Sequence, residues 1–194
     1  MARLVALFGL ALALLALPLR AQEFQTAATA AYVYDLSSGT VLFEKNADVP
    51  LPPASKLKLM TILMTFEALR SGQLTMDTTL PVSEAAMAYK GSSMFLNTMD
   101  RPTVSELLQG VIVLSGNDAT VVLAEALSPD GTEAGFARLM NARAQELGMT
   151  QSVFINSNGW PAEGQVMSMR DLAILAEHII VDFPEYYPMF AQQE

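Results

Sequence analysis

Hydrophobic positions follow three different patterns along the chain. An almost wholly apolar run, Leu4–Leu17, comes first, two short β-rich runs follow at Ala31–Asp35 and Thr40–Lys45, and helical spacing begins at Ser55. The segment Leu36-Ser37-Ser38-Gly39 separates the two β-rich runs, and a short linker that contains Gly is typical of a hairpin turn. We therefore expect an antiparallel hairpin near the N-terminus.

Helical periodicity and capping signals fill the rest of the chain. Apolar residues recur three or four positions apart between Ser55 and Arg70, and Gly72 just beyond them is suited to end a helix. Thr103-Val104-Ser105-Glu106 has the sequence of a capping box, which predicts the first turn of another helix. The predicted helices cover 55–70, 103–113, 118–127, 132–147 and 168–181.

This order of elements predicts an α+β fold in which one hairpin precedes a mostly helical body. A two-stranded hairpin is marginally stable alone, and the sequence that follows it contains no convincing partner strand. We therefore expect either a small sheet or a sheet whose later strands belong beyond Glu194. Neither an internal repeat nor a low-complexity linker divides the chain.

The first 21 residues have the layout of a secretory signal peptide. Arg3 supplies the positive start, Leu4–Leu17 the apolar centre, and Pro18 and Ala21 the end, so cleavage is expected after Ala21. A retained anchor is the alternative, although the apolar run is short for a membrane-spanning helix. Cleavage would leave 22–194 as the exported part, with 9 basic and 20 acidic side chains.

Composition removes several classes of chemistry. The 194 residues include no Cys and a single His, which excludes thiol nucleophiles and Cys-ligated metals and leaves a Ser–His–Asp triad dependent on His178 alone. His178 lies among apolar residues of a predicted helix, so we expect it at the core or its boundary. The formal net charge of −9 argues against nucleic acid as a partner. Chemistry must therefore use Ser, Thr, Lys, Asp, Glu, Tyr or Asn.

Ser55 and Lys58 form the single S-x-x-K sequence of the chain. They lie one helical turn apart at the start of a predicted helix, so their side chains share a face. A neutral Lys can take the proton of a Ser nucleophile if burial or a nearby cation lowers its pKa. Alternatively, Ser55 is a helix N-cap and Lys58 a solvated residue of the first turn.

A second polar cluster, Ser115-Gly116-Asn117-Asp118, lies between two predicted helices. Ser115 could relay a proton between Lys58 and a leaving group, and Asn117 could bind a substrate amide. Alternatively, the segment is a plain turn in which Asp118 caps the next helix.

Together the two clusters match the S-x-x-K and S-x-N pair of penicillin-recognising serine enzymes. From about Ala27 to its end, the chain resembles the low-molecular-mass D-alanyl-D-alanine carboxypeptidases, the penicillin-binding proteins of peptidase family S11. The segments that carry the resemblance are Phe43-Glu44-Lys45-Asn46-Ala47-Asp48, Pro52-Pro53-Ala54-Ser55, Lys58-Leu59-Met60-Thr61, Gly91-Ser92-Ser93-Met94-Phe95, Ser115-Gly116-Asn117-Asp118-Ala119, and Met140-Asn141 followed by Leu147-Gly148-Met149.

The resemblance implies the DD-peptidase fold and a role for each residue. Ser55 would be the acyl-enzyme nucleophile, Lys58 its general base, Ser115 an aid to proton transfer and Asn117 a substrate-binding residue. The implied reaction removes the terminal D-Ala from peptidoglycan pentapeptides, β-lactams would act as inhibitors, and neither a metal nor another cofactor is required. The expected location is the bacterial periplasm or cell envelope, with no membrane attachment encoded apart from the signal peptide.

One family motif is absent from the sequence. The K-T-G strand of the family, which completes the oxyanion hole and binds the substrate carboxylate, would follow the region in which this chain ends. We therefore expect 22–194 to be a partial DD-peptidase domain whose later strands are missing, and little activity if the chain truly ends at Glu194. Lys56 also stands where the family usually has an uncharged residue, often Met, and it could perturb Lys58.

Three alternatives remain. A D,D-endopeptidase would have the same motifs. A class A β-lactamase is a weaker hypothesis, because that family usually has S-D-N as its second motif and this chain has S-G-N. In addition, neither Glu133 nor Glu163 begins the E-x-x-x-N segment of that family. From another functional class, the chain could be a non-catalytic peptidoglycan-binding remnant.

Overall fold

The predicted N-terminal hairpin is confirmed. The computed structural model describes residues 24–192, and within them β1 (Ala31–Asp35) pairs antiparallel with β2 (Thr40–Lys45), with an irregularity between Val33 and Tyr34. The Asp35 carboxylate accepts hydrogen bonds from the backbone and side chain of Ser37, which orders the turn. The sheet of the described residues has these two strands. The predicted signal peptide lies outside the described residues.

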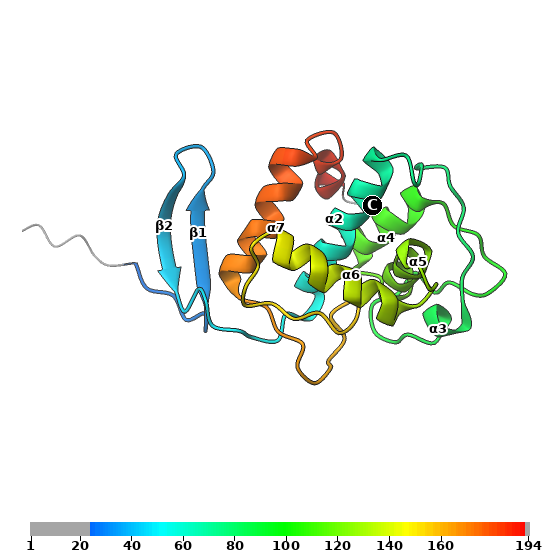
Figure 1. The fold of residues 1–194 in the computed structure, drawn as a ribbon, viewed down its shortest axis with the longest axis horizontal. Coiled ribbons are helices and arrows are strands. Elements are labelled where there is room, and N and C mark those ends of the chain that lie inside the picture. Colours follow the sequence, from blue (N-terminus) through cyan, green and yellow to red (C-terminus); the bar gives the residue numbers. More distant parts are fainter. Residues whose placement is uncertain (1–23, 193–194) are drawn as a thin grey trace, which may run out of the picture.

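The long helices also form where the periodicity predicted them (Figure 1). They are α2 (Lys58–Arg70), α4 (Val104–Leu114), α5 (Asn117–Leu127), α6 (Glu133–Glu146) and α7 (Met169–Asp182). Three shorter elements were not predicted as separate: the 3-10 turns η1 (Ala54–Leu57) and η2 (Tyr187–Ala191), and α3 (Glu84–Met87). Such short elements carry too few periodic positions to be read from a sequence.

Capping residues set the helix starts. The Thr103 side chain accepts from the backbone N–H of Glu106, whose carboxylate accepts from the backbone N–H of Thr103, so the predicted capping box of α4 is confirmed. Ser168 caps α7 by accepting from the backbone N–H of Asp171, at the start of the helix predicted over 168–181. These pairs satisfy backbone donors that a helix start otherwise leaves without partners.

Helix α2 is the centre of the hydrophobic core. Its neighbours are α4, α5, α6 and α7, so it is buried on most of its surface and has no single apolar stripe. The largest side chains removed from solvent include Phe66 and Met60 of α2, Leu107 of α4, Leu123 of α5 and Phe136 of α6. Burial of this apolar area is the main stabilising contribution to the helical body.

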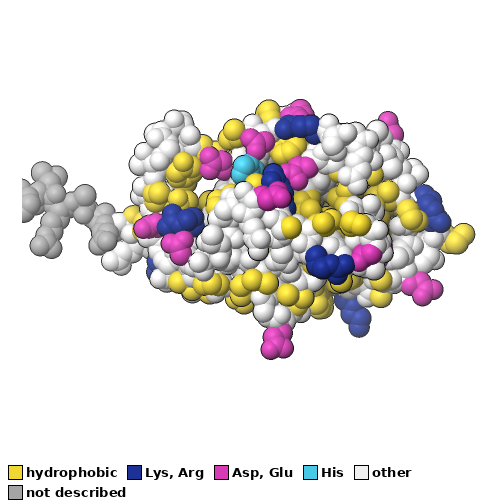
Figure 2. Space-filling view, viewed as in Figure 1, with side chains coloured by type: hydrophobic (Ala, Val, Ile, Leu, Met, Phe, Trp, Pro, Cys, Tyr) yellow, Lys and Arg dark blue, Asp and Glu magenta, His cyan; other side chains and the backbone are white. Residues whose placement is uncertain are grey.

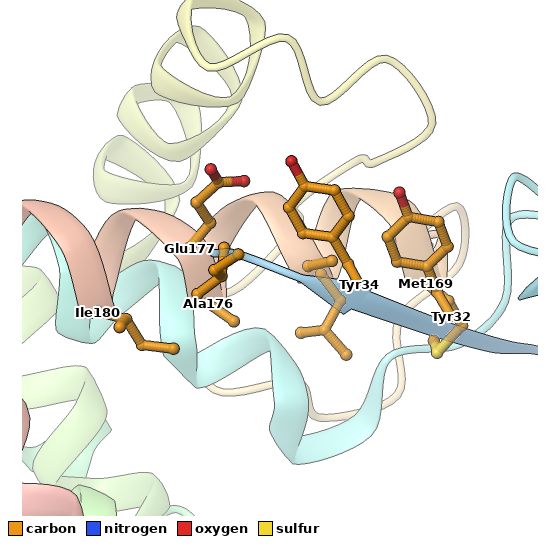
Figure 3. A pocket seen from close by; sticks show the side chains of 9 residues that line it. Tyr32, Tyr34, Met169, Ala176, Glu177 and Ile180 are labelled. Carbon is orange, nitrogen blue, oxygen red and sulfur yellow. The ribbon is translucent and has the colours of Figure 1, made fainter. Parts of the chain in front are cut away.

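The hairpin lies beside α7 at one end of the molecule (Figure 1). A groove of about 290 Å³ runs between β1 and α7; Tyr32 and Tyr34 line one side, and Met169, Ala176 and Ile180 line the other (Figure 3). The hairpin is therefore supported by a helix rather than by further strands of residues 24–192.

On the face in Figure 2, several charged side chains lie in small groups of both signs, and others stand alone. Arg170, for example, forms ion pairs with Glu44 and Asp48, which link α7 to the hairpin region. His178 pairs with Asp182 on α7 at 2.5 Å and is partly exposed, so its predicted boundary position is confirmed. Among residues 24–192, no helix combines the length and apolar character needed to cross a membrane.

Candidate active site

Ser55 and Lys58 lie together at the start of the central helix. Ser55 belongs to η1, and Lys58 is the first residue of α2. The Lys58 Nζ donates a hydrogen bond to Ser55 Oγ at 3.2 Å and another to the carbonyl oxygen of Asn158 at 2.8 Å. The contact that the i,i+3 spacing predicted is therefore formed.

Lys58 is buried, with 3% of its surface exposed, whereas Ser55 is open to solvent. Burial disfavours the charged ammonium and lowers the pKa of Lys58 to about 8. Burial accounts for this shift, so the charge of the exposed neighbour Lys56 is not needed to explain it. The alternative of a solvated Lys58 and an N-capping Ser55 is wrong, because Lys58 is buried and the N-cap positions of η1 and α2 belong to Pro53 and Leu57.

The backbone before Ser55 has an uncommon conformation. Ala54 has φ +49°, in the left-handed region that non-glycine residues rarely adopt. Gly159 packs directly against the backbone of Ala54 and Ser55, where a side chain would not fit. Strain of this kind persists only where the surrounding structure imposes it, and it is common at functional sites.

The 156–160 segment reaches η1 because of two backbone pairings. Val153 and Val166 exchange hydrogen bonds of 2.9 and 3.1 Å, which close a loop between them. Leu51 and Met167 form a second such pair, at 3.1 and 2.9 Å, and so bring that loop beside the proline-rich segment that precedes η1. Residues about 100 positions apart in the chain thereby meet at Lys58.

Ser115 ends α4 in the left-handed conformation, with φ +58° and ψ +34°. Its Oγ is buried and makes no hydrogen bond within residues 24–192, so no direct bond joins it to Lys58 there. Most buried hydroxyl groups in proteins have a partner. The unpaired Ser115 hydroxyl can accept a hydrogen bond from a bound molecule or donate one to it. Its role in proton transfer stays a prediction.

Asn117 is the first residue of α5 and is 7% exposed. Its Nδ2 donates to the carbonyl oxygen of Lys90 at 2.7 Å, and its backbone N–H donates to the carbonyl oxygen of Ser92 at 2.8 Å. A β-carbon at Gly91 would lie 3.3 Å both from Asn117 Nδ2 and from the Trp160 ring. Gly91 thus lets the Asn117 amide and the 156–160 segment approach each other.

Asp118 does not cap α5, contrary to the simpler interpretation of this turn. Gly116 occupies the N-cap position. The Asp118 carboxylate instead accepts hydrogen bonds from Ser93 Oγ and from the backbone N–H groups of Met94 and Leu96. It therefore fastens the segment after Gly91 to the start of α5.

Several residues of the site were not identified from the sequence: Tyr89, Glu133, Asn158 and Gly159. They contribute backbone groups or hydrogen bonds between distant segments, for which a single sequence holds no periodic signal. The run Asn156-Ser157-Asn158-Gly159 was a usable clue, because Asn, Ser and Gly together indicate an ordered turn. Trp160, the next residue, is 43% exposed and packs edge-to-face on Tyr89.

Comparison with known proteins gives consistent matches. The sequence profile of the family Peptidase_S11, D-alanyl-D-alanine carboxypeptidase, matches residues 18–194. The D-alanyl-D-alanine carboxypeptidase DacF of Bacillus subtilis is 38% identical over 161 residues, which are 83% of this chain and 41% of that protein.

Solved structures of proteins with the same family names are also similar to this chain. The D-alanyl-D-alanine carboxypeptidase DacD of Francisella tularensis superimposes with a TM-score of 0.85 at 36% identity, over 90% of this chain and 42% of that one. Penicillin-binding protein D2 of Listeria monocytogenes, in its ampicillin-bound form, has a TM-score of 0.73 at 32% identity, over 85% of this chain and 66% of that one. The chain spans about two fifths of the length of the curated relatives it matches.

Proposed function

The chain belongs to the D-alanyl-D-alanine carboxypeptidase family, peptidase S11, and we propose that it carries the serine nucleophile and the general base of a serine-type D-Ala-D-Ala carboxypeptidase site. Its fold is the DD-peptidase fold of those relatives. The substrate would be the pentapeptide stem of peptidoglycan, and the product a stem shortened by one D-Ala.

In the proposed reaction, Ser55 is the nucleophile and Lys58 is the general base. The neutral Lys58 amine accepts the hydroxyl proton while Ser55 Oγ attacks the carbonyl carbon of the penultimate D-Ala. The peptide bond then breaks, the terminal D-Ala leaves with a proton on its nitrogen, and an acyl ester remains on Ser55. Water hydrolyses this ester and restores the hydroxyl.

Ser115 and Asn117 would act on the substrate side of this reaction. The Ser115 hydroxyl could pass the proton from Lys58 to the leaving nitrogen, and the Asn117 side chain could hold a substrate amide. Supporting this assignment, the Ser115 hydroxyl has a free hydrogen-bonding capacity within residues 24–192.

One observation carries the proposal: the buried Lys58 amine lies 3.2 Å from the hydroxyl of the exposed Ser55. A lysine with a pKa of about 8 is about one tenth neutral at pH 7, a far larger neutral fraction than an ordinary lysine has. This is the requirement that the S-x-x-K mechanism places on its base.

β-Lactams would acylate the same serine, as the ampicillin-bound relative suggests. We further propose that residues 1–21 direct export, so that the site works in the bacterial cell envelope on peptidoglycan.

The test is labelling of the exported chain, 22–194, with a fluorescent penicillin. We expect covalent labelling of the wild-type chain, none of Ser55→Ala, and strongly reduced labelling of Lys58→Met. Lys56→Met is the matched control, because it removes an adjacent but exposed lysine. Equal labelling of Ser55→Ala, or no labelling of any folded variant, would overturn the proposal for this chain.

A further inference from the structure

Glu133 is the first residue of α6. Its carboxylate binds Ser157 and Asn158, in the loop whose carbonyl oxygen accepts a hydrogen bond from Lys58. Its Oε1 accepts hydrogen bonds from the backbone N–H of Ser157 at 2.9 Å, from the hydroxyl of Ser157 at 2.6 Å and from Asn158 Nδ2 at 3.2 Å. Its Oε2 accepts from the Tyr89 hydroxyl at 2.5 Å. Four donors from two distant segments thus converge on one side chain.

The target of these bonds is next to the acceptor of the Lys58 amine. Asn158, whose carbonyl oxygen accepts from Lys58 Nζ, is fixed by Glu133 through its own side chain and through its neighbour Ser157. The Ser157 carbonyl oxygen also accepts from Thr61 Oγ1 on α2, one turn after Lys58, at 2.7 Å. The segment therefore lies between the Glu133 carboxylate and the helix that carries Lys58.

Tyr89 fixes the other side of the carboxylate. Burial, reinforced by the hydrogen bond to Glu133, raises the pKa of Tyr89 to about 12, so its hydroxyl remains a donor across the ordinary pH range. Tyr89 directly precedes Lys90, whose carbonyl oxygen accepts from the Asn117 amide. The carboxylate thus connects the segments that support Lys58 and Asn117.

We propose that Glu133 is a positioning residue for Lys58: its carboxylate holds the Asn158 carbonyl against the Lys58 amine and keeps water away from it. The inference rests on the proposed role of Lys58 in the reaction. Glu133 itself touches neither Ser55 nor Lys58 in any hydrogen bond of residues 24–192, so it acts through the loop.

The protonation of Lys58 can be measured without any reaction. The chain contains four lysines, Lys45, Lys56, Lys58 and Lys90, so a sample labelled with ¹³C at lysine Cε gives few signals, and Lys58→Arg identifies the signal of Lys58. In Glu133→Ala, we expect the Lys58 pKa to rise from about 8 towards 10.5, because the released loop admits water. In Glu133→Gln, which keeps the shape and an acceptor, we expect it to stay near the wild-type value.

Asp171→Ala is the matched control. Asp171 also lies in the first turn of a helix and fastens a loop, since its carboxylate accepts from the backbone of Gln151 and the hydroxyl of Ser152. It makes no hydrogen bond to the 156–160 segment within residues 24–192, so its loss should leave the Lys58 pKa unchanged.

An unchanged Lys58 pKa in folded Glu133→Ala, or an equal rise in Asp171→Ala, would overturn the proposal. If Glu133→Ala does not fold, Ser157→Ala replaces it, since it removes the 2.6 Å donor alone. In Ser157→Ala we expect a smaller rise of the Lys58 pKa. An unchanged Lys58 pKa in that variant would also overturn the proposal. Failure of penicillin labelling would count against the proposed function and leave this titration result standing.

Discussion

A β-carbon on Gly159 would lie 1.9 Å from the carbonyl oxygen of Ala54, the residue directly before Ser55. Atoms cannot approach so closely, so the absence of a side chain at Gly159 sets the distance between the 156–160 segment and the serine turn. The same segment supplies the carbonyl oxygen that binds Lys58. The position of both residues thus depends on this close approach between two backbones.

We expect Gly159→Ala to lose both stability and penicillin labelling. The new methyl group must displace the Ala54 carbonyl, and the φ of +84° at Gly159 adds about 1–2 kcal/mol of strain for a non-glycine residue. Chemical denaturation and the labelling rate measure the two losses separately.

Gly148→Ala is the control for that experiment. Gly148 has nearly the same φ, +79°, but a β-carbon there meets nothing within 4 Å. It should lose only the same backbone strain, about 1–2 kcal/mol of stability, and keep its labelling rate. Equal labelling losses in the two variants would argue that general destabilisation, not the contact with Ala54, is responsible.

The rate of serine acylation should follow the titration of Lys58. Its pKa of about 8 means that the neutral, proton-accepting form becomes the major species as the pH rises through 8. We expect the labelling rate to increase up to that pH and then level off, in a stopped-time assay from pH 6 to 9.5. A rate independent of pH over this range would contradict a role for Lys58 as base.

The stability of the fold should also rise with pH in the alkaline range. In the unfolded chain Lys58 has the ordinary value of 10.5, so between about 8 and 10.5 the unfolded state binds more protons. The contribution of Lys58 to the free energy of unfolding is therefore lowest below pH 8. It increases by up to about 3 kcal/mol as the pH approaches 10.5. Urea denaturation of wild type and Lys58→Met measures the effect, which should be absent in the variant.

Asp118→Ala should destabilise the fold by about 2–3 kcal/mol, because it leaves several donors around residues 93–96 without their acceptor. Although burial raises the pKa of Asp118, the hydrogen bonds from Leu96, Met94, Ser93 and Ala119 hold it below its ordinary value. Its contribution to stability is thus complete above pH 4 and lost as the pH falls through the lowered pKa.

Denaturation of Asp118→Ala at pH 7 and at low pH tests this account. Asp130→Ala is the comparison, because in the described part of the chain Asp130 bonds only near neighbours in sequence, Ser128 and Thr132 in its own exposed turn and Arg138 in the helix that follows. A loss in Asp118→Ala no larger than in Asp130→Ala would mean that the 93–96 segment does not depend on Asp118.

Local signals accounted for most of the secondary structure. The capping box at Thr103 and the cap at Ser168 specify helix starts through groups three residues apart. The hairpin strands likewise begin and end where their β-rich runs do. In contrast, α3 was missed, because four residues show no period.

The sequence by itself determined the family, the hairpin, the long helices and the candidate pair Ser55 and Lys58, because each depends on residues close together in the chain. Tertiary structure alone decided that Lys58 is buried, that Asn158 binds its amine and that Glu133 holds Asn158. Burial and these contacts join segments up to 100 residues apart. The pKa of a lysine depends on such surroundings and not on its neighbours in sequence, so the property that would make Lys58 a base appears only in the folded chain.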